Sequence, residues 1–151
     1  MPLDPYTPCP CGSGKKLKWC CAQYFDTVER AFAQEDQGQH EAALQTIKGL
    51  LASHATNPSV WLYYAQFLYK AAAVEMEAAA RSQAARRGSG PNDPAPGHTQ
   101  KFEQAEEALS KALELNPNFG MAYFLRGQFR ENEGELIGSL LLYRKAADAY
   151  D

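Results

Sequence analysis

Three stretches of this chain repeat one pattern of small and large apolar residues, and this repetition constrains the fold more than any other feature. They are "GQHEAALQTIKGLLASHATNP" from Gly38, "QKFEQAEEALSKALELNP" from Gln100 and "GELIGSLLLYRKAADAYD" from Gly134. In each stretch a small residue is followed four places later by a larger apolar residue, and three places after that by another apolar residue. These residues are Ala43, Ile47 and Leu50; Ala105, Leu109 and Ala112; and Ser139, Tyr143 and Ala146. Such steps predict amphipathic helices, with small residues where two helix backbones approach closely.

Partner helices are expected between these stretches, in "DTVERAFAQEDQ", "PSVWLYYAQFLYKA" and "NFGMAYFLRGQFREN". The last two follow an Asn-Pro turn and carry Trp61 or Tyr123 early, with Ala65 or Gly127 four residues later. This register resembles tetratricopeptide repeats, which are antiparallel helix pairs of about 34 residues that stack into a solenoid. The resemblance implies an all-α, TPR-like helical-hairpin solenoid of about three repeats and six helices over residues 23–151. A helical bundle with a heptad-like apolar pattern is the alternative.

An insertion at about 73–100 interrupts the middle repeat. Its first part, "AAVEMEAAARSQAARR", is rich in alanine and predicts that the preceding helix continues from Ser59 to Arg87. The following "GSGPNDPAPGH" is expected to be a loop because proline and glycine interrupt helices. The protruding helix could be a partner-binding arm or a tolerated insertion, and the sequence favours neither.

All the cysteines of the chain lie in one short stretch, "PCPCGSGKKLKWCC" from Pro8 to Cys21. Four thiolates from two short clusters can surround one tetrahedral ion, and zinc prefers that shell. Gly12 and Gly14 permit the positive φ angles that a tight knuckle needs. A segment this short cannot bury a core, so metal binding must supply its folding energy. The predicted ligands are Cys9, Cys11, Cys20 and Cys21.

The segment "CPCGSGKKLKWCC" also resembles the SEC-C motif, a small zinc-binding tail first recognised in the SecA preprotein translocase motor. The resemblance implies Zn²⁺ as the cofactor and residues 1–22 as an N-terminal zinc-binding knuckle. The sequence departs from the motif at Leu17, where an aromatic residue is usual, at Trp19, where a polar or basic residue is common, and at Ala22. These differences leave the four ligand positions intact.

Three other roles for the cysteines stay open. They are disulfides in an oxidising compartment, a zinc site that releases its metal on oxidation, and a catalytic zinc site. The cytoplasm is the expected location because the chain shows no targeting signal, and thiols in that compartment favour metal over disulfides. No membrane partner is expected, since no run of 18 apolar residues occurs.

Two surfaces are predicted to bind partners. The zinc knuckle carries three lysines against a single acid, Asp4, whereas the whole chain has a net charge of −3. Its partner-binding residues are expected to be Lys15, Lys16, Lys18 and Trp19. By analogy with the repeat family, the concave surface of the solenoid would present Leu62, Gln66, Tyr69, Phe124, Gln128 and Glu131. The three consecutive leucines from Leu140 also predict an exposed apolar side chain that favours self-association or a partner.

These features favour a non-enzymatic adaptor that binds another protein, with the SEC-C resemblance pointing to chaperone, secretion or ribosome-associated machinery. One alternative is a nucleic-acid or ribosome binder that uses the basic knuckle, and another is a zinc- or redox-responsive regulator. No residues suggest an enzyme, because His40, His54 and His98 show neither metal-ligand spacing nor an evident acid partner.

Overall fold

The computed structural model describes residues 4–9, 14–85, 97–132 and 134–150. They form helices and loops, with one isolated backbone bridge between Pro8 and Lys16, so the all-helical prediction is confirmed for this part of the chain. Two short 3-10 turns precede six α-helices. The turns are η1 (Leu17–Trp19) and η2 (Cys21–Tyr24), and the helices are α1 (Phe25–Asp36), α2 (His40–Ser53), α3 (Pro58–Ala85), α4 (Gly97–Leu115), α5 (Gly120–Asn132) and α6 (Leu136–Tyr150).

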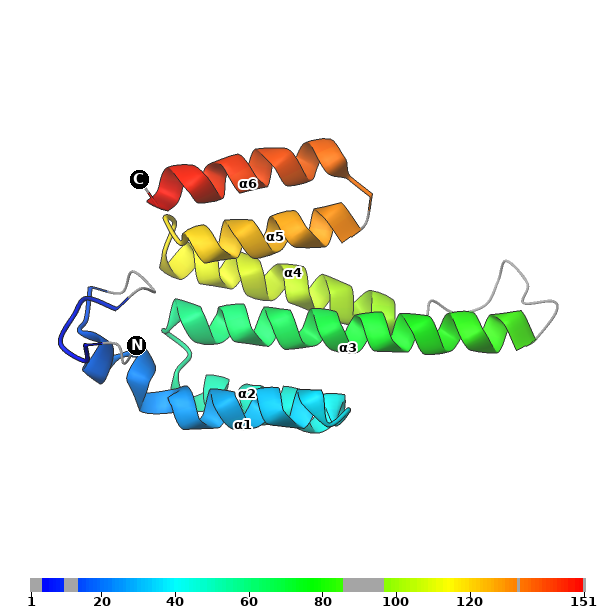
Figure 1. Cartoon of the computed structure of the whole chain (residues 1–151), viewed down its shortest axis with the longest axis horizontal. Helices are drawn as coiled ribbons and strands as arrows, with labels where there is room; N and C mark the ends of the chain where they lie inside the picture. Colours follow the sequence, from blue (N-terminus) through cyan, green and yellow to red (C-terminus); the bar gives the residue numbers. More distant parts are fainter. Residues whose placement is uncertain (1–3, 10–13, 86–96, 133, 151) are drawn as a thin grey trace.

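The six helices pack as three consecutive antiparallel hairpins, α1 with α2, α3 with α4 and α5 with α6, arranged in a row (Figure 1). The small residues of the repeated pattern are buried: Ala43 and Ala105 are fully buried and Ser139 nearly so. No helix in the described ranges has both the length and the apolar character needed to cross a bilayer.

Local chemistry sets the turns of the first and third hairpins. Gly38 and Gly134 both have positive φ, +78° and +84°, and each follows the end of a helix. Around Gly38, its amide bonds to the carbonyl of Glu35, and the Gln39 amide bonds to that of Gln34. The same pair of bonds recurs around Gly134. This is the Schellman arrangement, in which glycine ends a helix and reverses the chain.

The turns between hairpins use Asn-Pro. Asn57 caps α3, because its Oδ1 accepts a hydrogen bond from the Ser59 amide at 2.9 Å, and Pro58 occupies the first helical position. In the next turn, Asn116 Oδ1 accepts from the Asn118 amide at 3.2 Å. An Asn-Pro turn therefore connects each hairpin to the next, between α2 and α3 and between α4 and α5.

Helix α3 extends well beyond its neighbours (Figure 1). Its 28 residues correspond to about 42 Å, so the alanine-rich part of the insertion does prolong the helix. The predicted end at Arg87 lies outside the described residues. Gly97 and His98, which were expected in the loop, belong instead to α4.

Ion pairs at Lys101 hold the start of α4 against the preceding helices. Its ammonium group pairs with Glu75 on α3 and with Glu41 on α2, at 3.5 Å from the latter. Burial lowers the pKa of Lys101, but hydrogen bonds and the charges of the two carboxylates raise it on balance. These ion pairs therefore hold the chain in place at the start of α4, directly after the insertion.

A glycine on α5 makes a close contact that tests the packing of α5 against α6. A Cβ added at Gly127 would lie 2.8 Å from Cε1 of Tyr143 and 3.3 Å from the carbonyl oxygen of Ser139. We expect Gly127→Ala to lower the free energy of unfolding by about 1–2 kcal/mol, because overpacking costs about 1–3 kcal/mol and the gain in helix propensity returns only part of it. Urea denaturation measures the change.

The matched control is Gly49→Ala on α2. An added Cβ at Gly49 has no neighbour within 4 Å, so the substitution gains helix propensity without a steric cost. We expect it to raise the free energy of unfolding by up to about 1 kcal/mol. Two changes of the same sign would contradict the close packing of Gly127.

Candidate metal centre and interaction surfaces

The described N-terminal residues, 4–9 and 14–24, form a backbone turn, which we call the tip. The Cys9 amide donates to the Lys15 carbonyl at 2.9 Å, and the Leu17 amide donates to the Thr7 carbonyl at 2.9 Å. Gly14 has a φ of +81°, which residues with a side chain rarely adopt. The hydrogen bonds therefore fold the segment that carries Cys9 back onto the segment that leads to Cys20.

Two of the predicted zinc ligands are buried in the tip. Cys9 and Cys20 are each only 5% exposed, and the two sulfurs are not joined by a disulfide. Cys11 lies outside the described residues, and so does the side chain of Cys21, whose backbone opens η2. The described residues alone hold no group of three or more potential metal ligands.

Asn57, in the turn between α2 and α3, contacts the Cys20 sulfur. Its Nδ2 donates to this sulfur at 3.5 Å, while its Oδ1 accepts from the Tyr24 hydroxyl at 3.3 Å. An N–H group directed at sulfur stabilises a thiolate, which is the form that binds metal. The described residues therefore contribute two buried sulfurs to the predicted site, and one of them has an N–H donor.

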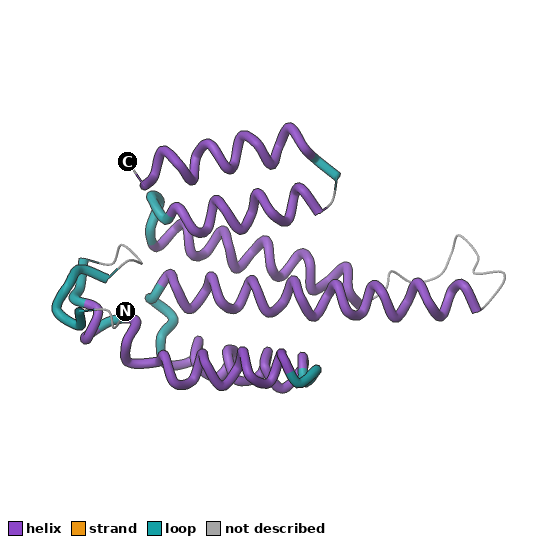
Figure 2. The backbone as a smooth tube through the Cα atoms, in the orientation of Figure 1, coloured by secondary structure: helices purple, strands orange, loops and turns teal. Residues whose placement is uncertain are grey.

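The tip shares its core with the helical array. Tyr24 is 1% exposed, and its ring lies edge-on to that of His54, with the centroids 5.3 Å apart. Cys9, Leu17 and Cys20 belong to the same buried cluster as the helices. The tip is thus docked at the end of the array where α1 begins and α2 ends (Figure 2).

His40 has an acid partner that the sequence analysis did not predict. Its Nδ1 lies 2.5 Å from Oε1 of Glu35, whose side chain is 7% exposed. The prediction that no histidine neighbours an acid is wrong here, because the Gly38 turn brings together two residues at the ends of different helices. The pair joins α1 to α2. The side chain of His98 lies outside the described residues.

The exposed face of the tip combines lysines with aromatic rings. The Nζ atoms of Lys16 and Lys18 lie 5.8 and 5.5 Å from the centre of the Tyr6 ring, and that of Lys18 lies 5.2 Å from the Trp19 ring. Tyr6 and Trp19 are each 59% exposed. Lys15 is exposed as well. Sequence analysis missed Tyr6, because only the folded turn places it beside the lysines.

A groove between α3 and α5 contains four of the six residues predicted for the concave surface. The cavity has a volume of about 400 Å³. We define this α3–α5 groove by its lining residues: Gln66, Tyr69, Lys70, Ala73, Leu125, Gln128, Phe129, Glu131 and Asn132. The Tyr69 ring stacks on that of Phe129, with the centroids 3.8 Å apart, and so fixes part of the groove floor.

The other two predicted residues lie elsewhere. Leu62 is only 8% exposed and belongs to the core, so it is not available to a partner. Phe124 is 41% exposed but faces α6, with its ring 5.4 Å from that of Tyr143. Glu131 reaches the same tyrosine and accepts a hydrogen bond from its hydroxyl, which raises the pKa of Tyr143. Leu62 and Phe124 are therefore separated from the groove by the rotation of α3 and of α5 about their axes.

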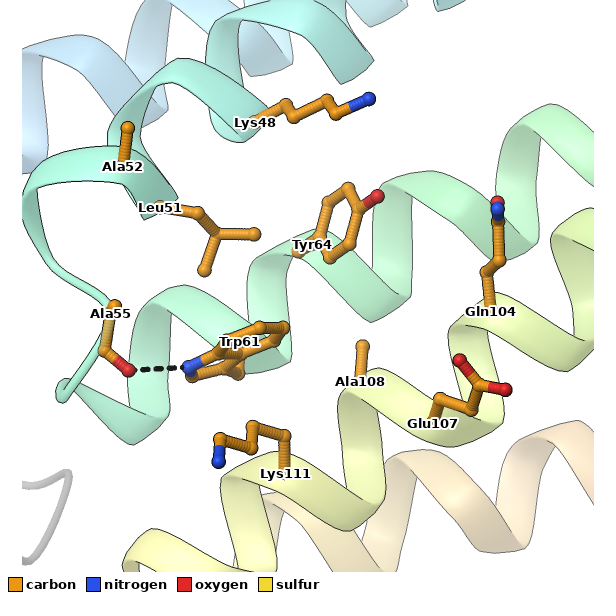
Figure 3. A pocket seen from close by; sticks show the side chains of 10 residues that line it. All are labelled: Lys48, Leu51, Ala52, Ala55, Trp61, Tyr64, Gln104, Glu107, Ala108 and Lys111. Atoms are coloured by element: carbon orange, nitrogen blue, oxygen red, sulfur yellow. Dashed lines mark hydrogen bonds between the residues drawn. The ribbon is translucent and has the colours of Figure 1, made fainter.

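A larger cavity of about 630 Å³ opens among α2, α3 and α4 and was not predicted (Figure 3). Trp61 forms one wall, and its indole N–H donates to the Ala55 carbonyl at 2.8 Å. Tyr64 forms another, and burial raises the pKa of its hydroxyl. Lys48 and Lys111 stand at opposite sides of the opening, and Glu107 lies near Lys111 (Figure 3). The sequence shows that aromatic residues crowd α3, but it does not show which of them face this cavity.

Comparison with known proteins gives a match in the tip. A protein-family model, the SEC-C motif, matches residues 7–23. This confirms the SEC-C resemblance over that segment, and the motif is of a zinc-binding type. No curated protein matches the sequence of the chain.

Proposed function

We propose that this protein is a non-enzymatic adaptor, in which a zinc-stabilised SEC-C tip is docked on a TPR-like array whose α3–α5 groove binds an extended segment of a partner protein. The observation that carries the proposal is the groove itself, which gathers residues from two helices far apart in the sequence. The proposed location is the cytoplasm.

Two equivalent hydrogen bonds support a TPR-like repeat. The indole of Trp61 donates to the carbonyl of Ala55, and the hydroxyl of Tyr123 donates to that of Pro117 at 3.0 Å. In both cases the aromatic side chain reaches back six residues and holds the turn that precedes its own helix. The same aromatic position therefore has the same structural task in two successive hairpins, as expected of repeats.

The chemistry of the groove suits a peptide in an extended conformation. Gln66, Gln128 and Asn132 each offer an amide that can both donate and accept, which matches the backbone groups of a peptide. The stacked ring of Tyr69 supplies an apolar surface, and Lys70 and Glu131 add one charge of each sign. A partner segment with polar backbone groups and an apolar side chain fits this lining.

Affinity capture with matched variants tests the groove. We expect Gln66→Ala combined with Gln128→Ala to weaken capture of a partner at least tenfold, because both amides lose their hydrogen bonds. The control is Gln45→Ala, an exposed glutamine on α2 outside the groove. Equal recovery of the same proteins by both variants and the wild type would contradict the proposal.

Zinc in this proposal is structural. Cys9, Cys11, Cys20 and Cys21 would hold it, and the bound ion would supply the folding energy of the tip. The buried sulfurs of Cys9 and Cys20 and the donor from Asn57 support this assignment. The SEC-C motif favours a partner in chaperone, secretion or ribosome-associated machinery. This part of the proposal rests on the resemblance of the motif and not on a binding site in this structure.

The exposed face of the tip supports a second function, binding of single-stranded nucleic acid, including that of the ribosome. Lys16 and Lys18 can contact phosphates, while Tyr6 and Trp19 are exposed enough to stack on bases. Such binding weakens steeply with salt, because each phosphate contact releases a counterion.

Fluorescence anisotropy with a labelled single-stranded RNA tests this second function. Trp19→Ala is expected to weaken binding about 5- to 150-fold, since one base-stacking contact is worth about 1–3 kcal/mol. Phe124→Ala, which removes an exposed aromatic ring outside the tip, is the control. Affinity that is independent of salt, or equal in both variants, would exclude the tip as a nucleic-acid site.

A further inference from the structure

The cavity among α2, α3 and α4 has the size and lining of a site for a small molecule (Figure 3). Its volume is about 630 Å³, and sites for small molecules typically enclose about 300–1,000 Å³ of mostly apolar space with a few polar groups. Small side chains leave this space open where larger ones would fill it: Ala52, Ala55 and Ala108. The cavity shares no lining residue with the α3–α5 groove, so the two sites are separate.

Two aromatic rings on α3 offer a surface for a planar apolar group. The rings of Trp61 and Tyr64 are inclined to each other by 70°, with the centroids 6.3 Å apart. A flat ligand stacked on one ring is therefore steeply inclined to the other, and aromatic pairs favour both arrangements. The hydrogen bond from the Trp61 indole to the Ala55 carbonyl fixes this surface before a ligand arrives.

The cavity is bounded at both ends along the helices. At one end lies the turn between α2 and α3, which contains Ala55. At the other end, one helical turn before Gln104, the ammonium group of Lys101 reaches from α4 to Glu41 on α2, at 3.5 Å. An extended chain that ran along the helices would meet both barriers, whereas a compact molecule fits between them.

The α2 side of the opening offers a cation and a hydroxyl to an anion. Lys48 forms no ion pair with the residues that the structure describes. The positions three and four residues away on α2, where an acid would pair with it, carry no acid: Leu44, Gln45, Leu51 and Ala52. The Tyr64 hydroxyl points away from Trp61, to the side on which Lys48 lies (Figure 3). Burial raises the pKa of Tyr64, so this hydroxyl stays protonated and can donate a hydrogen bond.

The α4 side of the opening does not favour a second anion. Lys111 is already paired with Glu114, at 3.4 Å, and Glu107 adds another carboxylate beside it. Two of these three side chains are acidic and one is basic, whereas Lys48 stands without an acid on the α2 side. This polarity suits a ligand that carries one negative charge at one end of an apolar body, and it disfavours a polyanion.

We propose that this cavity binds a small aromatic carboxylate, with its ring against Trp61 and its carboxylate directed to Lys48 and the Tyr64 hydroxyl. The rings and the small alanines determine that the body of the ligand is flat and apolar. The single unpaired lysine determines where the charge lies. This site is independent of the adaptor function proposed for the groove.

Nuclear magnetic resonance on the full chain, with 2-naphthoate as the probe, tests the proposal. The chain has two tryptophans, and only Trp61 lines the cavity, so the indole N–H signal of Trp19 in the tip is an internal reference. Naphthoate is expected to shift the Trp61 signal in a saturable way and to leave the Trp19 signal in place. The uncharged 2-naphthamide is expected to bind about fivefold more weakly, because hydrogen bonds to charged groups are the stronger ones.

Two substitutions separate the ring from the charge. Ala52→Phe is expected to abolish binding of both compounds, because it fills the cavity from an exposed position. Its control is Ala42→Phe, at an exposed alanine of the same helix outside the cavity, which should bind both compounds as the wild type does. Lys48→Gln is expected to weaken naphthoate about two- to fivefold, the size of an exposed ion pair, and to leave naphthamide unchanged. Lys145→Gln on α6 is the control for this loss of charge.

Four results would overturn the proposal. They are a Trp61 signal that does not move at millimolar naphthoate, equal shifts of both tryptophan signals, equal affinity for naphthoate and naphthamide, and binding that survives Ala52→Phe. A short acidic peptide with one phenylalanine is titrated in parallel. If this peptide shifts the Trp61 signal and naphthoate does not, the cavity is a peptide site and the assignment to a small carboxylate is wrong.

Discussion

Removing the metal is expected to abolish the order of the tip while the six helices persist. The tip is too short to hold a core by itself, and two of its predicted ligands are among its most buried residues. The amides of Cys9, Leu17 and Lys18 are bonded across the turn and should therefore exchange slowly with zinc bound. After treatment with a strong chelator, hydrogen exchange should show these amides unprotected and those of α2–α5 still protected.

The helical array should also lose stability, because it shares a core with the tip. Loss of Leu17 from this core alone forfeits about 1.5–3 kcal/mol of apolar burial. Thermal unfolding after chelation should consequently start at a lower temperature. The double variant Cys20→Ser, Cys21→Ser should reproduce both effects without a chelator. Tip amides that stay protected in metal-free protein, or purified protein without stoichiometric metal, would refute the zinc assignment.

The second large effect is expected at Asn57, which positions Cys20 and is not itself a ligand. Asn57→Asp keeps the oxygen that caps α3 and accepts from Tyr24, but it replaces the N–H directed at Cys20 by a carboxylate oxygen. Repulsion between this oxygen and the sulfur should lower the affinity for zinc. Outer-shell partners of metal ligands typically contribute about 10- to 100-fold in affinity, which sets the size of the expected loss.

Transfer of zinc to a chromogenic chelator measures the effect of Asn57→Asp. The matched control is Asn116→Asp, because Asn116 caps the equivalent turn between α4 and α5 by the same Asx contact. The control should release zinc at the wild-type rate. Melting of the helices should change little in either variant, since both keep their capping oxygen. Equal release of zinc from Asn57→Asp and wild type would show that Asn57 contributes only to the helix cap.

The helices were predictable because their limits depend on local chemistry. Gly38 and Gly134 end helices through positive φ angles, and Pro58 and Pro117 interrupt the helical hydrogen bonding. These effects act within a few residues, so they can be recognised without a structure. The continuation of α3 through the insertion followed in the same way from alanine content.

Only part of the predicted concave surface comes together in the structure. Gln66, Tyr69, Gln128 and Glu131 were assigned to one surface by analogy, and they do line one groove. Leu62 was assigned to the same surface, but it lies in the core. The rotation of α3 about its axis decides which of its many aromatic and aliphatic residues are covered, and this rotation depends on the helices packed around it.

The sequence by itself determined the helical class, the turns and the four cysteines of the tip, because helix propensity, turn geometry and ligand spacing all act between residues close along the chain. Only the tertiary structure decided that Asn57 reaches Cys20, that Glu35 pairs with His40 and that the aliphatic face of α6 is left uncovered. These features depend on how whole helices pack against one another, and the free energy of that packing is the sum of contacts between residues distant in the sequence.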